Sequence, residues 1–269
     1  MLNPVVQTLP GTVYGQAEPF APTQWSVILA AGKSQTNPEA SRAALAQLCE
    51  TYWPPLYTFL RARGHSKHDA QDLTQDFFAY LIERKIYARA NREKGKFRSF
   101  LLASLKNFLS DARDREQTLK RGGGHHFVPL HENQTEAVES LLETHHASGQ
   151  GAIGEDRLFE RSWAATLVAT TLDRVAAAYK AEGKENVFKE LRTFLTIGAA
   201  PLPTYAQLAV RLGTAESTLR SHVTRLRARY REVLRAEVRR TVNTEAEVDA
   251  ELRQLLRVLS NAPGIELKT

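Results

Sequence analysis

Residues 69–78 read DAQDLTQDFF, and this segment predicts an amphipathic helix. Leu73, Phe77 and Leu81 recur every four residues, which places them on one face of a helix. Ser66 precedes Asp69 by three residues, a variant of the capping box that favours a helix start at this point. Another face of the same helix is polar and consists of Asp69, Asp72, Gln75 and Asp76. We expect these four side chains to form an exposed acidic stripe.

The segments on both sides of residues 69–78 have the same helical period. Apolar residues recur at spacings of three and four in the ranges 45–60, 97–109, 158–179, 188–195, 205–234 and 248–259. No segment alternates apolar and polar residues over more than a few positions, as a half-buried strand would. The sequence therefore predicts an all-α fold.

Two helical domains joined by a flexible linker account for this pattern. Prolines interrupt the N-terminal residues, and a run of three glycines, 122–124, lies in a middle segment without a clear period. The expected parts are a disordered arm at 1–22, a first domain at 23–115, a linker at 116–155, a second domain at 156–242, and a C-terminal helix and tail at 243–269. The C-terminal helix could be an intramolecular lid or plain packing, and packing is the simpler interpretation.

The charge is divided into blocks along the chain. The whole chain has a net charge of +6, yet residues 83–121 hold twelve Lys and Arg against five acidic residues, and residues 201–240 hold nine Arg against three Glu. Residues 131–160 between them hold seven acidic residues against one Arg. Two basic blocks separated by an acidic spacer suggest two contacts with a polyanion, although solvated helical faces would have a similar composition.

Composition excludes several classes of protein and site. The single cysteine, Cys49, excludes an internal disulfide and any multi-cysteine metal site. No apolar run exceeds six residues, whereas a membrane helix needs about 20. No basic residue precedes Lys33, so no secretory signal is expected. We expect a cytoplasmic protein with no cofactor, no metal site, no catalytic residue and no membrane insertion.

Residues 204–234 have the pattern of a helix-turn-helix. A short helix to Leu212 is followed by Gly213, which permits a tight turn, and then by an arginine-rich helix from Glu216 to about Leu234. Such a second helix enters the major groove of DNA, where Arg220 and Arg225 have the donors to bind guanine. Once the apolar positions are removed, the residues expected to read DNA are Glu216, Ser217, Arg220, Ser221, Thr224 and Arg225.

The first basic block combines cationic and planar side chains. The polar segment 88–96 precedes a helix that contains Phe97, Phe100 and Phe108 and that we expect to show Arg98 to solvent. Cations and aromatic rings together suit single-stranded or opened DNA, because an unstacked base needs a flat face and its phosphate needs a countercharge. Helical spacing alone more often means that such aromatic residues lie in a core.

These segments resemble a known family. Residues 69–78, with 97–102, Asn107 and 111–113, look like conserved region two of extracytoplasmic-function sigma factors. Residues 205–213, followed by 217–221 and 225–227, look like region four of the same family. Sigma factors are the promoter-recognition subunits of bacterial RNA polymerase. The resemblance therefore implies a role in promoter recognition, promoter opening and transcription initiation.

The resemblance also implies partners and roles for particular residues. Core RNA polymerase would bind the acidic stripe through the clamp helices of its largest subunit. The basic helix at 216–234 would read the minus-thirty-five element of promoter DNA. An anti-sigma factor is a further partner that such proteins often have. The residues implied to bind the minus-ten element are Asn91, Arg92, Lys94, Lys96, Phe97, Arg98, Asn107 and Arg113.

Three other functions stay open at this point. A helix-turn-helix regulator that does not act through polymerase would leave the acidic stripe unexplained. An enzyme would need a metal cluster built from His125, His126, His131, His145 and His146, or from His65 and His68, but these histidines lack the accompanying ligand pattern of zinc sites. A scaffold that binds polymerase without DNA is the third alternative.

Overall fold

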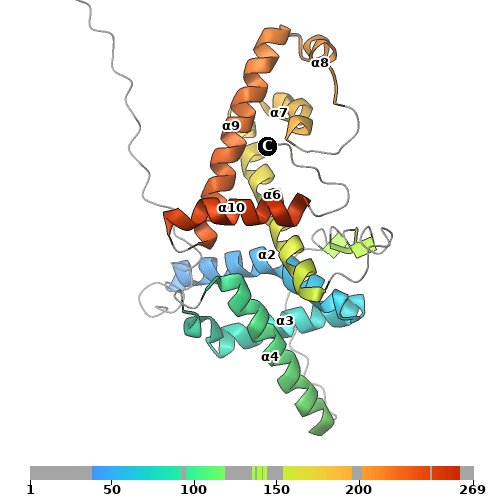
Figure 1. Cartoon of the computed structure of the whole chain (residues 1–269), viewed down its shortest axis with the longest axis vertical. Coiled ribbons are helices and arrows are strands. Elements are labelled where there is room, and N and C mark those ends of the chain that lie inside the picture. Colours follow the sequence, from blue (N-terminus) through green and yellow to red (C-terminus); the bar gives the residue numbers. More distant parts are fainter. Residues whose placement is uncertain are drawn as a thin grey trace, which may run out of the picture.

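The computed structural model describes residues 38–91, 95–118, 135–136, 138–140, 142–143, 154–195, 202–242 and 244–260. All regular structure within these ranges is helical, which confirms the predicted all-α fold. Figure 1 shows an elongated molecule with α2, α3 and α4 at one end and α7 and α8 at the other. The elements are α2 (Pro38–Ala62), α3 (Lys67–Glu83), η1 (Ile86–Arg89), α4 (Phe97–Thr118), α6 (Glu155–Ala181), α7 (Glu185–Leu191), η3 (Arg192–Phe194), α8 (Tyr205–Leu212), α9 (Glu216–Thr241) and α10 (Glu245–Ser260).

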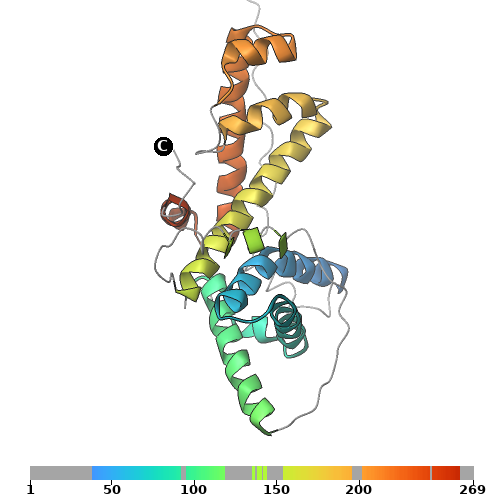
Figure 2. The same ribbon diagram turned by 90° about the vertical axis from the view of Figure 1, so that its right-hand side faces the viewer.

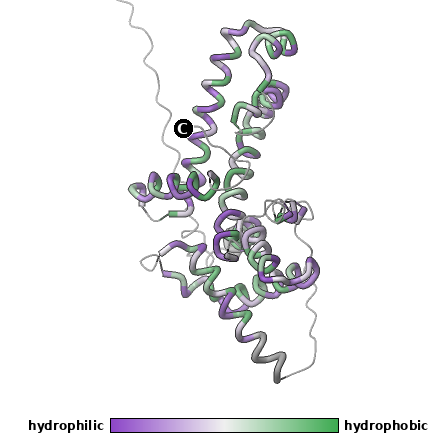
Figure 3. The backbone as a smooth tube through the Cα atoms, turned by 45° about the vertical axis from the view of Figure 1, so that its right-hand side comes forward, coloured by the Kyte–Doolittle hydropathy of each residue, from purple (hydrophilic) through white to green (hydrophobic). Residues whose placement is uncertain are grey.

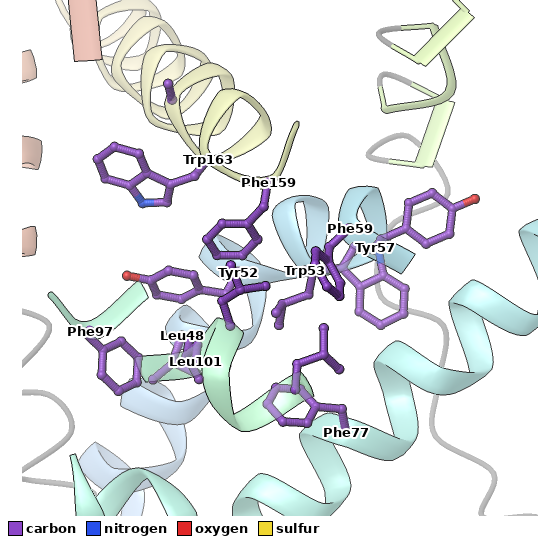
Figure 4. Packing of buried hydrophobic residues seen from close by; sticks show 14 of the residues in the cluster. Leu48, Tyr52, Trp53, Tyr57, Phe59, Phe77, Phe97, Leu101, Phe159 and Trp163 are labelled. Atoms are coloured by element: carbon purple, nitrogen blue, oxygen red, sulfur yellow. The ribbon is translucent and has the colours of Figure 1, made fainter. Parts of the chain in front are cut away.

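The first hydrophobic core is centred on α2. Tyr52 of α2 is buried and meets the ring of Phe97 on α4 edge-on, with the ring centres 5.6 Å apart. Phe77 of α3 is fully buried in the same cluster. In Figure 4, Phe159 and Trp163 descend from α6 toward α2. The N-terminal half of α6 is therefore part of this core together with α2, α3 and α4.

The second core lies at the other end of the molecule. It joins the C-terminal half of α6 to α7, α8 and the N-terminal half of α9. Its buried members are Val175, Tyr179, Phe188, Leu191, Leu208, Leu219, Val223 and Leu226. This core holds the two helices of the predicted helix-turn-helix together.

Two long helices run from one core to the other. Figure 2 shows α6 inclined to α9, so that the two helices separate toward the end of the molecule that holds α8. Figure 3 shows hydrophobic and hydrophilic residues alternating along both helices. The end of α9 contributes Val238 to the first core, as α6 does at its start with Phe159. The described part of the chain therefore has two cores that share two helices.

The sequence predicted a linker without regular structure at residues 135–143, but the described residues of this range are helical. Residues 135–136, 138–140 and 142–143 are helical, and Val138 and Leu142 are buried in the first core. The carboxylate of Glu139 accepts hydrogen bonds from Arg61 Nε at 2.7 Å and from Tyr57 Oη at 2.6 Å. These partners lie on α2, far away in sequence, so the local pattern could not reveal the contact. The expected domain boundaries stay a prediction, but the packing extends across them.

The C-terminal helices also differ in detail from the expectation. α9 continues past Leu234 to Thr241, where its last turn is buried beside α6 and α10. The helix expected near 248–259 is present as α10, with Val248, Leu255 and Leu259 in the first core. Glu251 is buried on the same face, and the expected Leu252 is partly buried against the same core. Figure 1 shows α10 lying crosswise between the two ends of the molecule.

Candidate nucleic-acid interface

The helix-turn-helix is formed by α8 and α9 as predicted. Thr204 caps α8, and its side chain accepts a hydrogen bond from the N–H of Gln207 at 3.2 Å while the Gln207 side chain accepts one from the N–H of Thr204 at 3.0 Å. Gly213 ends the helix with φ +59°, a left-handed conformation that favours glycine. Leu208 and Leu219, both fully buried, hold the two helices together. The turn therefore fixes the direction in which α9 starts.

The face of α9 that was predicted to read DNA is open to solvent. Glu216, Ser217, Arg220, Ser221, Thr224 and Arg225 are all exposed. The guanidinium of Arg220 lies 4.5 Å from the ring centre of Tyr205 and 3.8 Å from the carboxylate of Glu216. These contacts leave Arg220 mostly exposed while restricting where its side chain points. The face thus combines two cations with hydroxyl groups, which suits hydrogen bonding to base edges.

The acidic stripe lies along the exposed side of α3. Asp69, Asp72 and Asp76 are exposed, and Gln75 is half-buried. The hydroxyl of Ser66 lies 2.6 Å from Asp69 Oδ2, and this hydrogen bond lowers the pKa of the Asp69 carboxyl. His68 Nδ1 lies 3.0 Å from Asp72 Oδ2. Three carboxylates of the stripe are therefore exposed to solvent along α3.

Only part of the predicted minus-ten set can be placed. Asn91, Lys96 and Asn107 are exposed around the start and middle of α4. Arg92, Lys94 and the side chain of Arg113 lie outside the described residues, as do the arm at 1–22 and the five histidines between 125 and 146. Phe97 is buried against Tyr52, so its ring belongs to the core in this arrangement.

Arg98 is buried, so the prediction that it faces solvent is wrong. Its guanidinium is 3% exposed, and its Nε lies 2.9 Å from both carboxylate oxygens of Glu160 on α6. Its Nη1 donates a hydrogen bond to Glu251 on α10, and its guanidinium carbon lies 4.0 Å from the ring centre of Trp163. Burial by itself lowers the pKa of Arg98, but the charges of Glu160 and Glu251 outweigh this effect and raise the pKa.

One family model matches the chain over the helices just described. Residues 48–118, from α2 to the end of α4, match the model of Sigma-70 region 2. This match supports a sigma factor of the sigma-70 family. Searches among curated proteins and among solved structures gave no match.

The matched segment contains the acidic stripe and the basic segment that precedes α4. Region 2 implies an interaction with core RNA polymerase and with promoter DNA. This sigma factor therefore acts in promoter recognition and transcription initiation. Sigma factors in general are not enzymes. Within the described residues of this sigma factor, no group of His, Cys, Asp and Glu could hold a metal ion, and no helix is long and apolar enough to cross a membrane.

Sequence reasoning missed the residues that bury Arg98. Glu160, Trp163 and Glu251 come from two helices that the sequence assigned to other parts of this sigma factor. One signal was present for Glu251, because it follows Val248 by three residues and precedes Leu255 by four, on the apolar face of its helix. A carboxylate at such a position requires a buried cation or hydrogen-bond donor.

Proposed function

We propose that this sigma factor is of the extracytoplasmic-function type, with region 2 within residues 23–115 and region 4 within residues 156–242. It binds core RNA polymerase in the cytoplasm and brings it to promoters through two DNA contacts. The observation that carries the proposal is the exposed reading face of α9, on the same chain as the matched region 2 segment. A regulator that contacts DNA at one place would need the exposed face of α9 but would not need a region 2 segment.

The acidic stripe is the proposed docking site for polymerase. Asp69, Asp72 and Asp76 present three carboxylates along one side of α3, next to Gln75. Charges on a protein surface attract partners of opposite sign and orient them before contact. The clamp helices of the largest polymerase subunit are the proposed partner, as the family resemblance implies.

Each basic region has a separate proposed role on promoter DNA. α9 reads the minus-thirty-five element as duplex, with Arg220 and Arg225 positioned to donate paired hydrogen bonds to guanine. Asn91, Lys96 and Asn107, with Arg92, Lys94 and Arg113, bind the minus-ten element. Phe97 and Arg98 are covered in the described arrangement, and Lys96 is paired with Glu251, so the proposed contacts of these three residues with DNA require a rearrangement. An anti-sigma partner stays a prediction from the family resemblance.

A transcription assay tests the proposal. Purified chain is added to core RNA polymerase on templates that carry candidate promoters, including the promoter of its own gene. We expect transcripts from a promoter that core polymerase alone does not use. A regulator acting without polymerase would shift the DNA in a binding assay but would give no transcript, and this result would overturn the proposal. A scaffold would bind polymerase and leave the DNA unbound.

A further inference from the structure

α10 packs on the first core through a face that includes a buried acid. Val248, Leu255 and Leu259 are buried there, as expected for an amphipathic helix. Glu251 lies among them with its side chain only 2% exposed. An apolar residue at this position would pack without the cost of removing a charge from water. The acid therefore calls for an explanation beyond simple packing.

The partners of Glu251 are two residues proposed to bind the minus-ten element. Its Oε2 lies 2.5 Å from the ammonium of Lys96, and its Oε1 accepts a hydrogen bond from Arg98. Lys96 and Arg98 flank Phe97 at the start of α4. The carboxylate of Glu251 thus binds the two cations in the way a DNA phosphate would.

α10 also forms ion pairs with α9 on the surface. Arg235 of α9 binds Asp249 at 2.5 Å and Glu245 at 3.3 Å, and Arg239 binds Glu245 at 2.7 Å. The side chains of Arg235, Asp249 and Glu245 are largely exposed, and exposed ion pairs contribute little to stability. α10 begins at Glu245, four positions after α9 ends at Thr241. The helix is held by its apolar face and by Glu251.

We infer that α10 is an autoinhibitory helix whose Glu251 occupies the minus-ten binding cations of the free sigma factor. While α10 is docked, Lys96 and Arg98 neutralise Glu251 and are unavailable to promoter DNA. When α10 leaves, Lys96 becomes free and Arg98 keeps only its pair with Glu160. Because binding is reciprocal, DNA that engages these cations must also displace α10. The inference rests on the proposed function, since it assigns a regulator to the same DNA site.

The first test compares two variants of the full chain that each remove one charge from α10. Glu251→Gln removes the pairs with Lys96 and Arg98, whereas the matched control Asp249→Asn removes only the pair with Arg235. Each is titrated with a labelled single-stranded oligonucleotide that spans the region opened in the transcription assay. We expect Glu251→Gln to bind about 5- to 150-fold more tightly than wild type, the usual range of coupling between two sites. Asp249→Asn should match wild type.

The same titrations in the presence of core polymerase separate this inference from the proposed function. If wild type with polymerase fails to bind the oligonucleotide, the proposed function is wrong. If it binds, but the free Glu251→Gln variant gains no more affinity than Asp249→Asn, the autoinhibitory role of α10 is wrong. Far-UV circular dichroism checks that the variants are folded.

A second measurement uses only the wild-type chain and does not depend on the folding of a variant. Hydrogen exchange is followed in α10 and in α3, with and without saturating oligonucleotide. We expect the amides of α10 to exchange faster when DNA is bound, while those of α3 stay protected. Bound DNA with unchanged protection in α10 would overturn the inference, because the helix and the DNA would then occupy different surfaces.

Discussion

The guanidinium carbon of Arg98 lies 4.0 Å from the centre of the Trp163 ring, which connects the start of α4 with α6. The same guanidinium binds Glu160 of α6 and Glu251 of α10. One side chain therefore joins three helices that are distant in the sequence. A planar group is well suited to this task, because it can stack on a ring while its edges donate hydrogen bonds to two carboxylates.

Replacement of Arg98 by Lys should destabilise the chain although the charge is kept. An ammonium cannot stack flat on Trp163 or donate to both carboxylates with a fixed geometry. We expect the free energy of unfolding to fall by about 1 to 3 kcal/mol, measured by urea denaturation with tryptophan fluorescence. Arg257→Lys, at an exposed position of α10, is the control. Equal urea midpoints for Arg98→Lys and wild type would show that the stacked and paired geometry contributes nothing.

Glu139 should make the free energy of unfolding depend on pH in the acid range. Hydrogen bonds from Arg61, and further ones from Tyr57, lower the pKa of the Glu139 carboxyl from 4.5 to about 2 in the folded chain, against the effect of burial. Because the folded pKa is the lower one, the stabilisation is complete above pH 4.5 and is lost as the pH falls toward 2. Glu139→Gln should lower the free energy of unfolding at pH 7 by about 1 to 3 kcal/mol. The loss should shrink below pH 4.5.

The exposed Glu136 provides the control for this experiment. Glu136→Gln removes a neighbouring carboxylate from the same helical segment, and we expect no change in the unfolding midpoint at pH 7. If Glu139→Gln and Glu136→Gln behave alike at every pH, the contact between residues 135–143 and α2 is not a stabilising one.

Arg220→Ala and Arg225→Ala should each weaken promoter binding. Each arginine lies on the exposed face of α9, where a paired hydrogen bond to guanine is worth about 1 to 3 kcal/mol of binding free energy. The expected result is a loss of affinity together with a relaxed base preference at one upstream position, measured by competition among promoter variants. The control is Arg257→Ala, which removes an exposed arginine from α10. Unchanged affinity and unchanged base preference would refute the assignment of α9 as the reading helix.

Reversal of the charge at Asp72 and Asp76 should weaken polymerase binding. The double variant Asp72→Lys with Asp76→Lys replaces two exposed carboxylates of the acidic stripe by cations, so it changes attraction to a basic partner into repulsion. We expect a loss of core polymerase in pull-down assays, with binding of the promoter by the free chain unchanged. Asp173→Lys with Glu185→Lys makes the same change in charge at exposed positions of α6 and α7. Equal recovery of polymerase with both double variants would mean that the stripe is only a solvated surface.

Two helix starts and one turn were predictable because their causes are local. The capped start of α3 at Ser66, the capped start of α8 at Thr204 and the turn at Gly213 each depend on neighbouring residues. Exposure of the six reading residues on α9 follows from the helical period in the same way. These features could be predicted without knowing which helices pack against each other.

The burial of Arg98 depended instead on which helices pack against each other in the folded chain. Its two carboxylate partners lie 62 and 153 positions further along the chain, a separation that no periodic pattern reports. The sharing of α6 and α9 by both cores has the same origin, since an amphipathic face does not specify what covers it. The helical segments and the exposed face of α9 thus follow from short-range chemistry, whereas long-range packing places Glu251 of α10 on Lys96 and Arg98 at the start of α4.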